Sequence, residues 1–406
     1  MFRILHTSDW HIGHLFYGKR RIDEFESFFA FLLETVKTTS PDALIVSGDV
    51  FDSPIVSNAA QEQYYSLLSA LAETSCKNII ITAGNHDSPS FLEAPSSILK
   101  RLNVHISARG DSLQTKEPLL LKDSEGKPAC VVCAVPYLRE RDVRRVEDGE
   151  SPDEKAAKYC EGILNFYTEV CSEALKLKQE YKIPLVVTGH LFASGGKTLD
   201  DDGRRDIFVG KLVNINAEHF PSYIDYLALG HLHMPQKINA KISARYSGSP
   251  LPMGFSEASQ QKQLVLADFK EGTTELSFID IPVFQRLERP EGSLKELIDL
   301  LEQLKESKKS VWLEVTVTSD ESPTEIKQTL EKAVAESQLE ILIIKRDAPT
   351  LSIEKRLKTT SDIKRITPPA VFAELLKKND FDEEKKELLT SLFNEALTAV
   401  QEEIAQ

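Results

Sequence analysis

Short apolar runs alternate with helical patterns along residues 1–280 of this chain. Runs such as 78–83 and 226–229 have the length and apolar character of buried strands. Between the runs, segments such as 21–38 and 58–74 place apolar residues at helical spacing. Strands and helices that alternate in this way are typical of βαβ units, so the pattern predicts an α/β fold for residues 1–280.

The pattern changes near residue 281. Residues 281–347 have the character of strand, helix, strand, helix and strand in turn, without a cluster of potential ligands. The five elements are expected at 283–289, 294–305, 311–318, 324–335 and 339–345. This order predicts a second, compact α+β domain over residues 281–347.

Residues 348–406 predict a linker and a helical tail. Residues 348–367 combine proline, serine, threonine and basic residues without a clear period, which is typical of a linker. In the tail, 368–406, helical patterns occupy about 368–378 and 382–404. The second carries an apolar stripe formed by Leu388, Leu389, Leu392, Phe393, Ala396, Leu397, Val400 and Ile404. Such a helix usually packs on its own domain, but the linker before it favours docking into a groove on another protein.

Composition places the chain among intracellular multidomain proteins. Of its 406 residues, 41% are hydrophobic and 28% are charged, which is ordinary for a soluble protein. No apolar run approaches the ~20 residues that a membrane helix needs. The chain enters its first strand pattern without a signal segment, so we expect a cytoplasmic protein. Among the five cysteines, Cys130 and Cys133 would face opposite sides of one strand, which favours reduced core cysteines over a metal site.

The net charge of −14 argues against a generic nucleic-acid binder, whose affinity comes largely from neutralising phosphates. Any bound divalent ion would offset this by adding local positive charge, and a partner protein could supply nucleic-acid affinity. Basic residues do cluster in two places: Lys19, Arg20 and Arg21, and then Arg139, Arg141, Arg144 and Arg145. They are either substrate contacts or solvated helix faces, and the candidates for substrate contact are Lys19, Arg20, Arg139 and Arg141.

Five polar clusters follow apolar runs and carry the side chains of a metal site. Asp9 and His11, and likewise His231 and His233, are spaced i, i+2, so each pair points to one side of an extended backbone. The other clusters are Gly48-Asp49-Val50-Phe51-Asp52, Gly84-Asn85-His86-Asp87 and Gly189-His190. Open α/β sheets place their sites at the carboxyl ends of strands, and these oxygen and nitrogen ligands suit divalent metals in hydrolysis. Glycines before four of the clusters would allow a sharp exit from the strand.

Each cluster taken alone has an ordinary structural explanation. Gly84-Asn85-His86-Asp87 could be a turn, and His231-Leu232-His233 could be a polar strand end. Five such clusters in series favour one metal centre instead. The remaining histidines, His6, His14, His105 and His219, lack this setting and are expected to be structural or on the surface.

The motif order Asp-x-His, Gly-Asp-x-x-Asp, Gly-Asn-His-Asp, Gly-His and Gly-His-x-His resembles the calcineurin-type metallophosphoesterase superfamily. Residues 1–14, 206–210 and 246–252 are similar to its bacterial DNA-nuclease branch, and the similarity runs over essentially the whole chain. The resemblance implies a four-layer α/β/β/α sandwich, with 281–347 as a capping domain that helps define DNA access. It also implies a tail that binds the base of the coiled coil in an ABC-type ATPase, and a homodimer within a heterotetramer.

The resemblance implies a role for each candidate residue. One ion would take Asp9, His11, Asp49 and His233, and the other Asp49, Asn85, His190 and His231, with Asp49 as the bridge. His86 is expected to contact the scissile phosphate or the leaving oxygen, oriented by Asp52 or Asp87. Oxygen and nitrogen ligands without thiolate favour manganese, with magnesium or iron as alternatives.

The expected activity is that of a 3′→5′ double-strand exonuclease and hairpin endonuclease in DNA repair, recombination and replication. Another phosphodiesterase or phosphatase of the superfamily is the first alternative, against which the 283–347 unit and the tail argue. A DNA-end-binding scaffold without catalysis is the second, against which the complete set of ligand positions argues.

Overall fold

The computed structural model describes residues 1–145, 149–193, 215–318 and 321–346, together with 372, 385–386 and 388–393. The chain forms two compact units, Met1–Lys345 and Arg346–Gln406. The expected linker and most of the expected tail lie outside the described residues, as does segment 206–210. In the second unit, 388–393 is helical, and the rings of Phe372 and Phe393 stack with centroids 4.1 Å apart.

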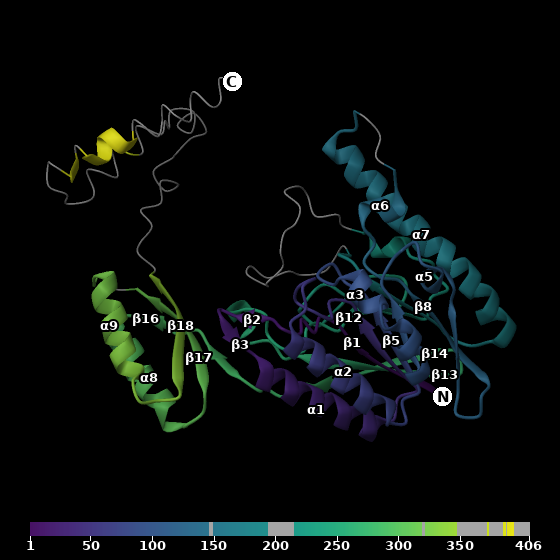
Figure 1. Ribbon diagram of the computed structural model, residues 1–406, viewed down its shortest axis with the longest axis horizontal. Helices are drawn as coiled ribbons and strands as arrows, with labels where there is room; N and C mark the ends of the chain where they lie inside the picture. Colours follow the sequence, from purple (N-terminus) through teal and green to yellow (C-terminus); the bar gives the residue numbers. More distant parts are fainter. Residues whose placement is uncertain are drawn as a thin grey trace. The chain divides into compact units, whose positions relative to one another are not determined.

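Two six-stranded sheets form the larger part of the first unit (Figure 1). The first has the order β14 (Thr273–Asp280), β13 (Gln263–Lys270), β1 (Phe2–Thr7), β4 (Ala43–Ser47), β5 (Asn78–Thr82) and β6 (Val104–Ser107). The second has the order β11 (Gln236–Lys237), β12 (Ala244–Tyr246), β10 (Tyr226–Gly230), β9 (Leu185–His190), β8 (Pro128–Ala134) and β7 (Leu119–Lys122). Strands β1, β4, β5 and β6 run parallel, as do β8, β9, β10 and β12, so each sheet gathers several carboxyl ends on one edge.

Alternate residues of the central strands enter different cores, because successive side chains point to opposite faces of a sheet. Ile4 packs between the two sheets, whereas Leu5 faces α1 (Ile22–Thr39) and α2 (Asn58–Ala72). In the second sheet, Val186 faces the first sheet and Val187 faces α7 (Pro152–Tyr181). Figure 1 shows α1 and α2 on one side of the strands and α7 on the other. The result is the expected four-layer α/β/β/α sandwich.

A smaller sheet with its own core follows. It contains β15 (Arg286–Glu288), β17 (Val311–Val317), β16 (Glu291–Gly292) and β18 (Leu339–Arg346), covered by α8 (Leu294–Glu306) and α9 (Pro323–Val334). The five expected elements are present, but the first strand is shorter than expected and β16 was not foreseen. Phe16 from the hairpin of β2 (Leu15–Phe16) and β3 (Lys19–Arg20) packs against Trp312 of the small sheet.

The other helical segments are short. They are α3 (Pro89–Glu93), α4 (Ser96–Leu99), α5 (Leu113–Lys116), α6 (Glu140–Val143) and the 3₁₀ turns Lys100–Leu102, Ala217–His219 and Phe255–Glu257. Among the described residues, no helix combines the length and apolar character that crossing a bilayer requires. The cysteines are all free, with Cys130 packed between the sheets and Cys133 against α7, on opposite faces of β8 as expected.

Candidate metal centre

The carboxyl ends of β1, β4, β5, β9 and β10 deliver the predicted ligands to one place. Backbone hydrogen bonds join the loops after β1 and β4, since the N–H of Asp9 donates to Gly48 O and that of His11 donates to Asp49 O, both at 3.0 Å. Asp9, His11 and Asp49 are at most 2% exposed, so their desolvation must be offset by strong partners.

Asp49 lies between two groups of ligand atoms. Its Oδ2 is 3.2 Å from Nε2 of His190 and 3.7 Å from Nε2 of His11. Its Oδ1 accepts a hydrogen bond of 2.8 Å from the backbone N–H of His86. One carboxylate oxygen therefore faces imidazoles from both sides, as a ligand shared by two ions must.

The remaining candidate ligands lie in two groups, in line with the division that the family resemblance implies. On one side, the Nε2 atoms of His11 and His233 are 3.2 Å apart, and Asp9 completes the group. On the other, Asn85 Oδ1 lies 3.0 Å from His190 Nε2 and 3.1 Å from His231 Nδ1. Ligands held at ~2.1 Å from one ion and at right angles to each other are about 3 Å apart, so these spacings fit divalent ions.

The donor atoms also fit a cation chemically. Carboxylate, amide and imidazole atoms converge there, and each of them can bind a cation through a lone pair. The pKa of Asp49 is held well below its usual range: burial would raise it, but His190 and His11 outweigh burial. Burial would lower the pKa of His190, but the carboxylates of Asp49 and Asp9 outweigh burial and raise it to about 9. The buried carboxylates therefore favour positive charge at His190.

Several ligands are held in strained backbone. Asp9, His11 and Asp49 have φ values of 52°, 49° and 49°, and His231 has 107°. Such conformations cost roughly 1–3 kcal/mol each and persist only where the surroundings enforce them, commonly at functional sites.

The glycines before the ligands serve two purposes. Only Gly48 adopts a positive φ, of 83°, as a sharp exit from the strand requires. At Gly84 a Cβ would overlap the carboxylate of Asp49, and at Gly230 it would overlap Ser47 O. Glycine is therefore required at Gly84 and Gly230 by close packing, and not by the sharp turn that was expected there.

A buried ion pair behind His233 was missed by the sequence analysis. Glu257 Oε1 lies 3.4 Å from Nδ1 of His233. Lys262 Nζ donates to Glu257 Oε2 at 2.5 Å and to the backbone carbonyl of His233 at 3.0 Å. Glu257 is 1% exposed and Lys262 is 4% exposed. The pair lies beside the His233 ring, in the position that outer partners of metal-binding histidines commonly take. In the sequence, both residues sit in a polar stretch that gives no sign of burial.

His190 is oriented by a backbone partner. Its Nδ1 lies 2.9 Å from Ser47 O, and because a carbonyl can only accept, Nδ1 carries the proton. Nε2 is thereby left to face Asp49 and Asn85.

The surroundings of His86 differ in part from expectation. Its Nδ1 contacts the backbone carbonyl of Asp52 at 2.9 Å, whereas the Asp52 carboxylate lies 2.9 Å from His14 and 3.5 Å from His11. His14 thus has a place beside the centre that its sequence setting did not indicate. Asp87 accepts backbone hydrogen bonds from Val50, Phe51 and Gly84, so it fixes the loops rather than the ring of His86.

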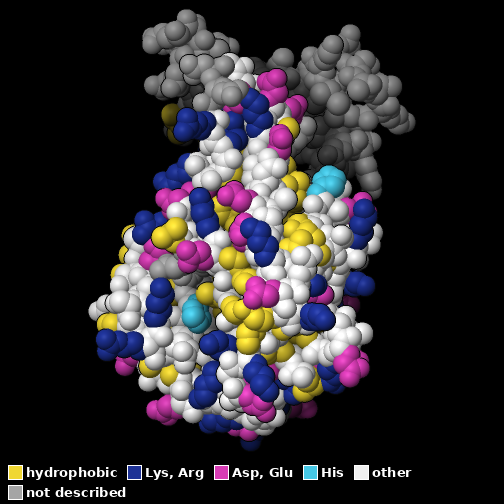
Figure 2. All heavy atoms as spheres, turned by 90° about the vertical axis from the view of Figure 1, so that its right-hand side faces the viewer, with side chains coloured by type: hydrophobic (Ala, Val, Ile, Leu, Met, Phe, Trp, Pro, Cys, Tyr) yellow, Lys and Arg dark blue, Asp and Glu magenta, His cyan; other side chains and the backbone are white. Residues whose placement is uncertain are grey.

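The four predicted DNA contacts occupy different settings. Lys19 forms an ion pair with Glu340 of β18, and Arg20 is exposed on the β2–β3 hairpin. Arg139 and Arg141 line a pocket that Gly84 also lines. On the face drawn in Figure 2, basic and acidic side chains of the described residues are interspersed, so this face offers no continuous basic stripe.

The comparisons with known proteins agree on one family. Residues 2–235 match the model of the calcineurin-like phosphoesterases, and 283–380 match the Type 5 capsule protein repressor C-terminal domain. The SbcD component of the nuclease SbcCD of Escherichia coli K12 is 32% identical over 398 residues, covering 97% of this chain and 98% of that protein. The SbcD component from Rhodobacter capsulatus is 30% identical, covering 91% and 93%. That from Bacillus subtilis is 32% identical, covering 66% and 67%.

Proposed function

Since the chain belongs to the SbcD family of nuclease subunits, which are calcineurin-like phosphoesterases, it is a metal-dependent nuclease, and we propose that it hydrolyses double-stranded and hairpin DNA at a two-metal centre. The observation that carries the proposal is the position of Asp49 Oδ2 between His190 and His11. Two ions about 3.5–4 Å apart are typical of phosphodiester hydrolases, and they need such a shared ligand.

The residues present divide into two ligand sets. Asp9, His11, Asp49 and His233 would hold one ion. Asp49, Asn85, His190 and His231 would hold the other. When bound, two divalent ions supply Lewis-acid activation of water and of the phosphodiester. Manganese is the ion that this oxygen and nitrogen set favours, with magnesium or iron as alternatives.

His86 is the group proposed to act on the substrate. Its Nδ1 carries a proton, because its partner is the carbonyl of Asp52. Nε2 is then the ring nitrogen left for a phosphate oxygen or for the leaving oxygen. Asp52 acts as a positioning residue, through its carbonyl on His86 and through its carboxylate on His14 and His11.

We also propose a partner protein and a direction of DNA cleavage for this chain. The named relatives are components of SbcCD complexes, so we expect an SbcC-type ABC ATPase with a coiled coil as the partner. The tail 368–406 would dock on that ATPase, residues 281–347 would cap the nuclease domain 1–280, and two copies would pair in a cytoplasmic heterotetramer. Within it the chain would act as a 3′→5′ exonuclease and hairpin endonuclease in DNA repair and recombination.

The test is cleavage of end-labelled linear and hairpin duplexes by the purified full chain in manganese. Bis-p-nitrophenyl phosphate is hydrolysed in parallel, and Asp49→Ala is the blank. The proposal requires that the wild type cleaves DNA, with or without the ATPase partner, and that Asp49→Ala does not. Hydrolysis of the small diester without DNA cleavage, even with the partner present, would assign the chain to the general phosphodiesterases. Failure on both substrates would support the non-catalytic scaffold.

A further inference from the structure

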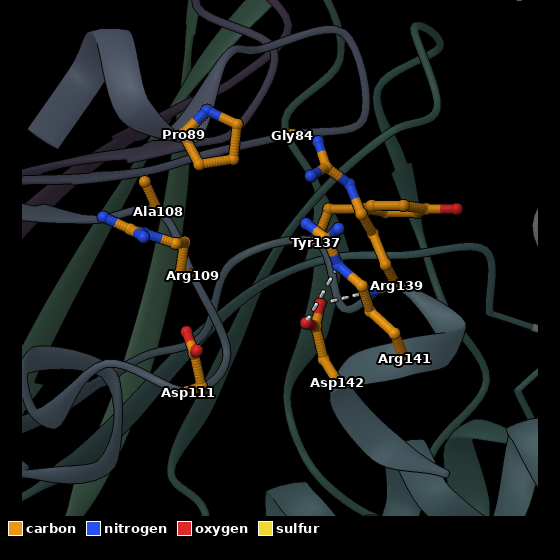
Figure 3. Close-up of a pocket in the computed structure, with 9 residues that line it drawn as sticks. All are labelled: Gly84, Pro89, Ala108, Arg109, Asp111, Tyr137, Arg139, Arg141 and Asp142. Atoms are coloured by element: carbon orange, nitrogen blue, oxygen red, sulfur yellow. Dashed lines mark hydrogen bonds and ion pairs between the residues drawn. The ribbon is translucent and has the colours of Figure 1, made fainter. Parts of the chain in front are cut away.

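A pocket of about 280 Å³ opens beside the metal centre (Figure 3). Gly84, which lines it, directly precedes the ligand Asn85. Tyr137 forms another wall, and its ring centroid lies 6.2 Å from that of the ligand His190. The backbone N–H of Tyr137 donates to Ala83 O at 2.8 Å, which joins this wall to the end of β5. The pocket and the metal centre therefore share one boundary.

Two arginines on this boundary have little to neutralise them. The guanidinium group of Arg139 makes no hydrogen bond or ion pair within the described part of the chain, and only its backbone N–H is used, by Asp142 Oδ2 at 2.8 Å. Arg141 Nε is 3.8 Å from Asp142 Oδ1, and its side chain is 74% exposed. Figure 3 shows both guanidinium ends beside Tyr137.

The other charges of the pocket are already engaged. Arg109 lies on the opposite side in Figure 3 and binds Glu93, with Nε 2.6 Å and Nη2 2.5 Å from the carboxylate. Asp142 caps the N-terminus of α6 through the hydrogen bond from Arg139. Asp111 adds negative charge near Arg109 rather than near Arg139. What remains is a pair of guanidinium groups beside Tyr137, across the pocket from Pro89 and Ala108 (Figure 3).

We propose that this pocket binds the backbone phosphate next to the scissile one in a DNA strand. The proposal rests on the function proposed above and specifies how that site recognises the DNA strand next to the cleaved bond. Arginine forks match phosphate oxygens in pairs, and an unpaired guanidinium loses little by exchanging water for phosphate. The Tyr137 ring, which lines the pocket, has its centroid 6.2 Å from that of His190, so the pocket adjoins the metal centre on the side where a neighbouring nucleotide would lie. The ring of Tyr137 would then lie against the sugar or base of the flanking nucleotide.

The pocket would distinguish long substrates from short ones. A small diester occupies the metal centre alone, whereas a DNA strand also reaches Arg139 and Arg141. The ratio of kcat/KM for DNA to kcat/KM for the small diester therefore reports on the pocket. Arg145 is the matched control, because it is an exposed arginine of the same segment that does not line the pocket.

The experiment uses the full chain with Arg139→Gln, Arg141→Gln, the double variant and Arg145→Gln. Binding of a fluorescein-labelled duplex is measured by anisotropy in EDTA across a salt series, and hydrolysis of end-labelled duplex and bis-p-nitrophenyl phosphate is measured in manganese. The double variant should reduce the slope of log K against log salt by about 0.9, the effect of one lost phosphate contact, and each single variant should reduce it by less. The activity ratio should fall about fivefold per arginine, and Arg145→Gln should match the wild type in both measurements.

Arg139→Lys separates charge from geometry. It should keep the salt slope and still lower the activity ratio, since lysine retains the charge but not the fork. Slopes and ratios equal to those of Arg145→Gln would overturn the subsite. An equal loss on both substrates would overturn it too, because it would mean a disturbed metal centre. If the wild type itself hydrolyses only the small diester, the proposed function fails; if the wild type cleaves DNA and the variants do so equally, the subsite alone fails.

Discussion

Replacing Lys262 with methionine removes the ammonium group that holds Glu257 against His233. The change leaves a carboxylate that is 1% exposed without its 2.5 Å partner. Breaking a buried pair on one side costs about 3–5 kcal/mol, because the remaining charge is uncompensated. At about 2–4 °C per kcal/mol, the melting temperature should fall by about 6–20 °C. The backbone carbonyl of His233 also loses a 3.0 Å hydrogen bond, so the ligand loop loses support.

Metal affinity should fall together with stability. Loss of an outer partner of a metal-binding histidine typically lowers affinity 10–100-fold, so the Kd for manganese should rise about that much. Melting is followed by circular dichroism in EDTA, and affinity by titration calorimetry. Lys241→Met is the control, because Lys241 is exposed and its change should leave both quantities near those of the wild type.

A double replacement separates lost packing from uncompensated charge. In Glu257→Leu with Lys262→Met no charge is left buried, so this variant should be more stable than Lys262→Met alone. Its manganese affinity should still be reduced, since Nδ1 of His233 has lost the carboxylate 3.4 Å away. The reasoning is refuted if Lys262→Met melts within about 2 °C of Lys241→Met, or binds manganese as the wild type does.

Four further outcomes follow from the same geometry. Asp49→Ala should abolish turnover and lower the manganese content, and activity within about tenfold of wild type would contradict the bridging role. His86→Ala should retain manganese, measured by atomic emission, while losing cleavage; loss of metal would make His86 a ligand. Cys160, the one cysteine that is not fully buried, should be alkylated by iodoacetamide in the native protein well before the other four, as mapped by mass spectrometry. Deletion of 368–406 should spare hydrolysis of the small diester but abolish co-purification with the ATPase partner.

The strands and their polar ends could be predicted from sequence because local pattern determines both. Apolar runs buried on two faces have a recognisable length, and the side chain after each run must lie at the sheet edge. Asp9 and His11 lie on the same side because side chains at positions i and i+2 of an extended backbone point in the same direction. The helices 21–38 and 58–74 were predicted within a few residues of α1 and α2, since their apolar stripes face one sheet.

The supporting interactions could not be predicted, because they join residues that are distant in sequence. Lys262 lies in a polar stretch, and only the folded loop brings it 3.0 Å from the carbonyl of His233. Asp87 was a candidate to orient His86, yet it accepts three backbone hydrogen bonds from two loops. Lys19 belongs to a basic triplet, but its ion pair is with Glu340, on a strand of the smaller sheet. In each case the partner decides the role.

The most direct test of the account is manganese electron paramagnetic resonance on the metal-free protein titrated with Mn²⁺. If Asp49 Oδ2 is shared, saturation should occur at two ions per chain, with an exchange-coupled spectrum in place of that of isolated Mn²⁺. Asp49→Ala should lose the coupled spectrum. Saturation at one ion per chain, or two ions without coupling, would contradict a centre built around Asp49.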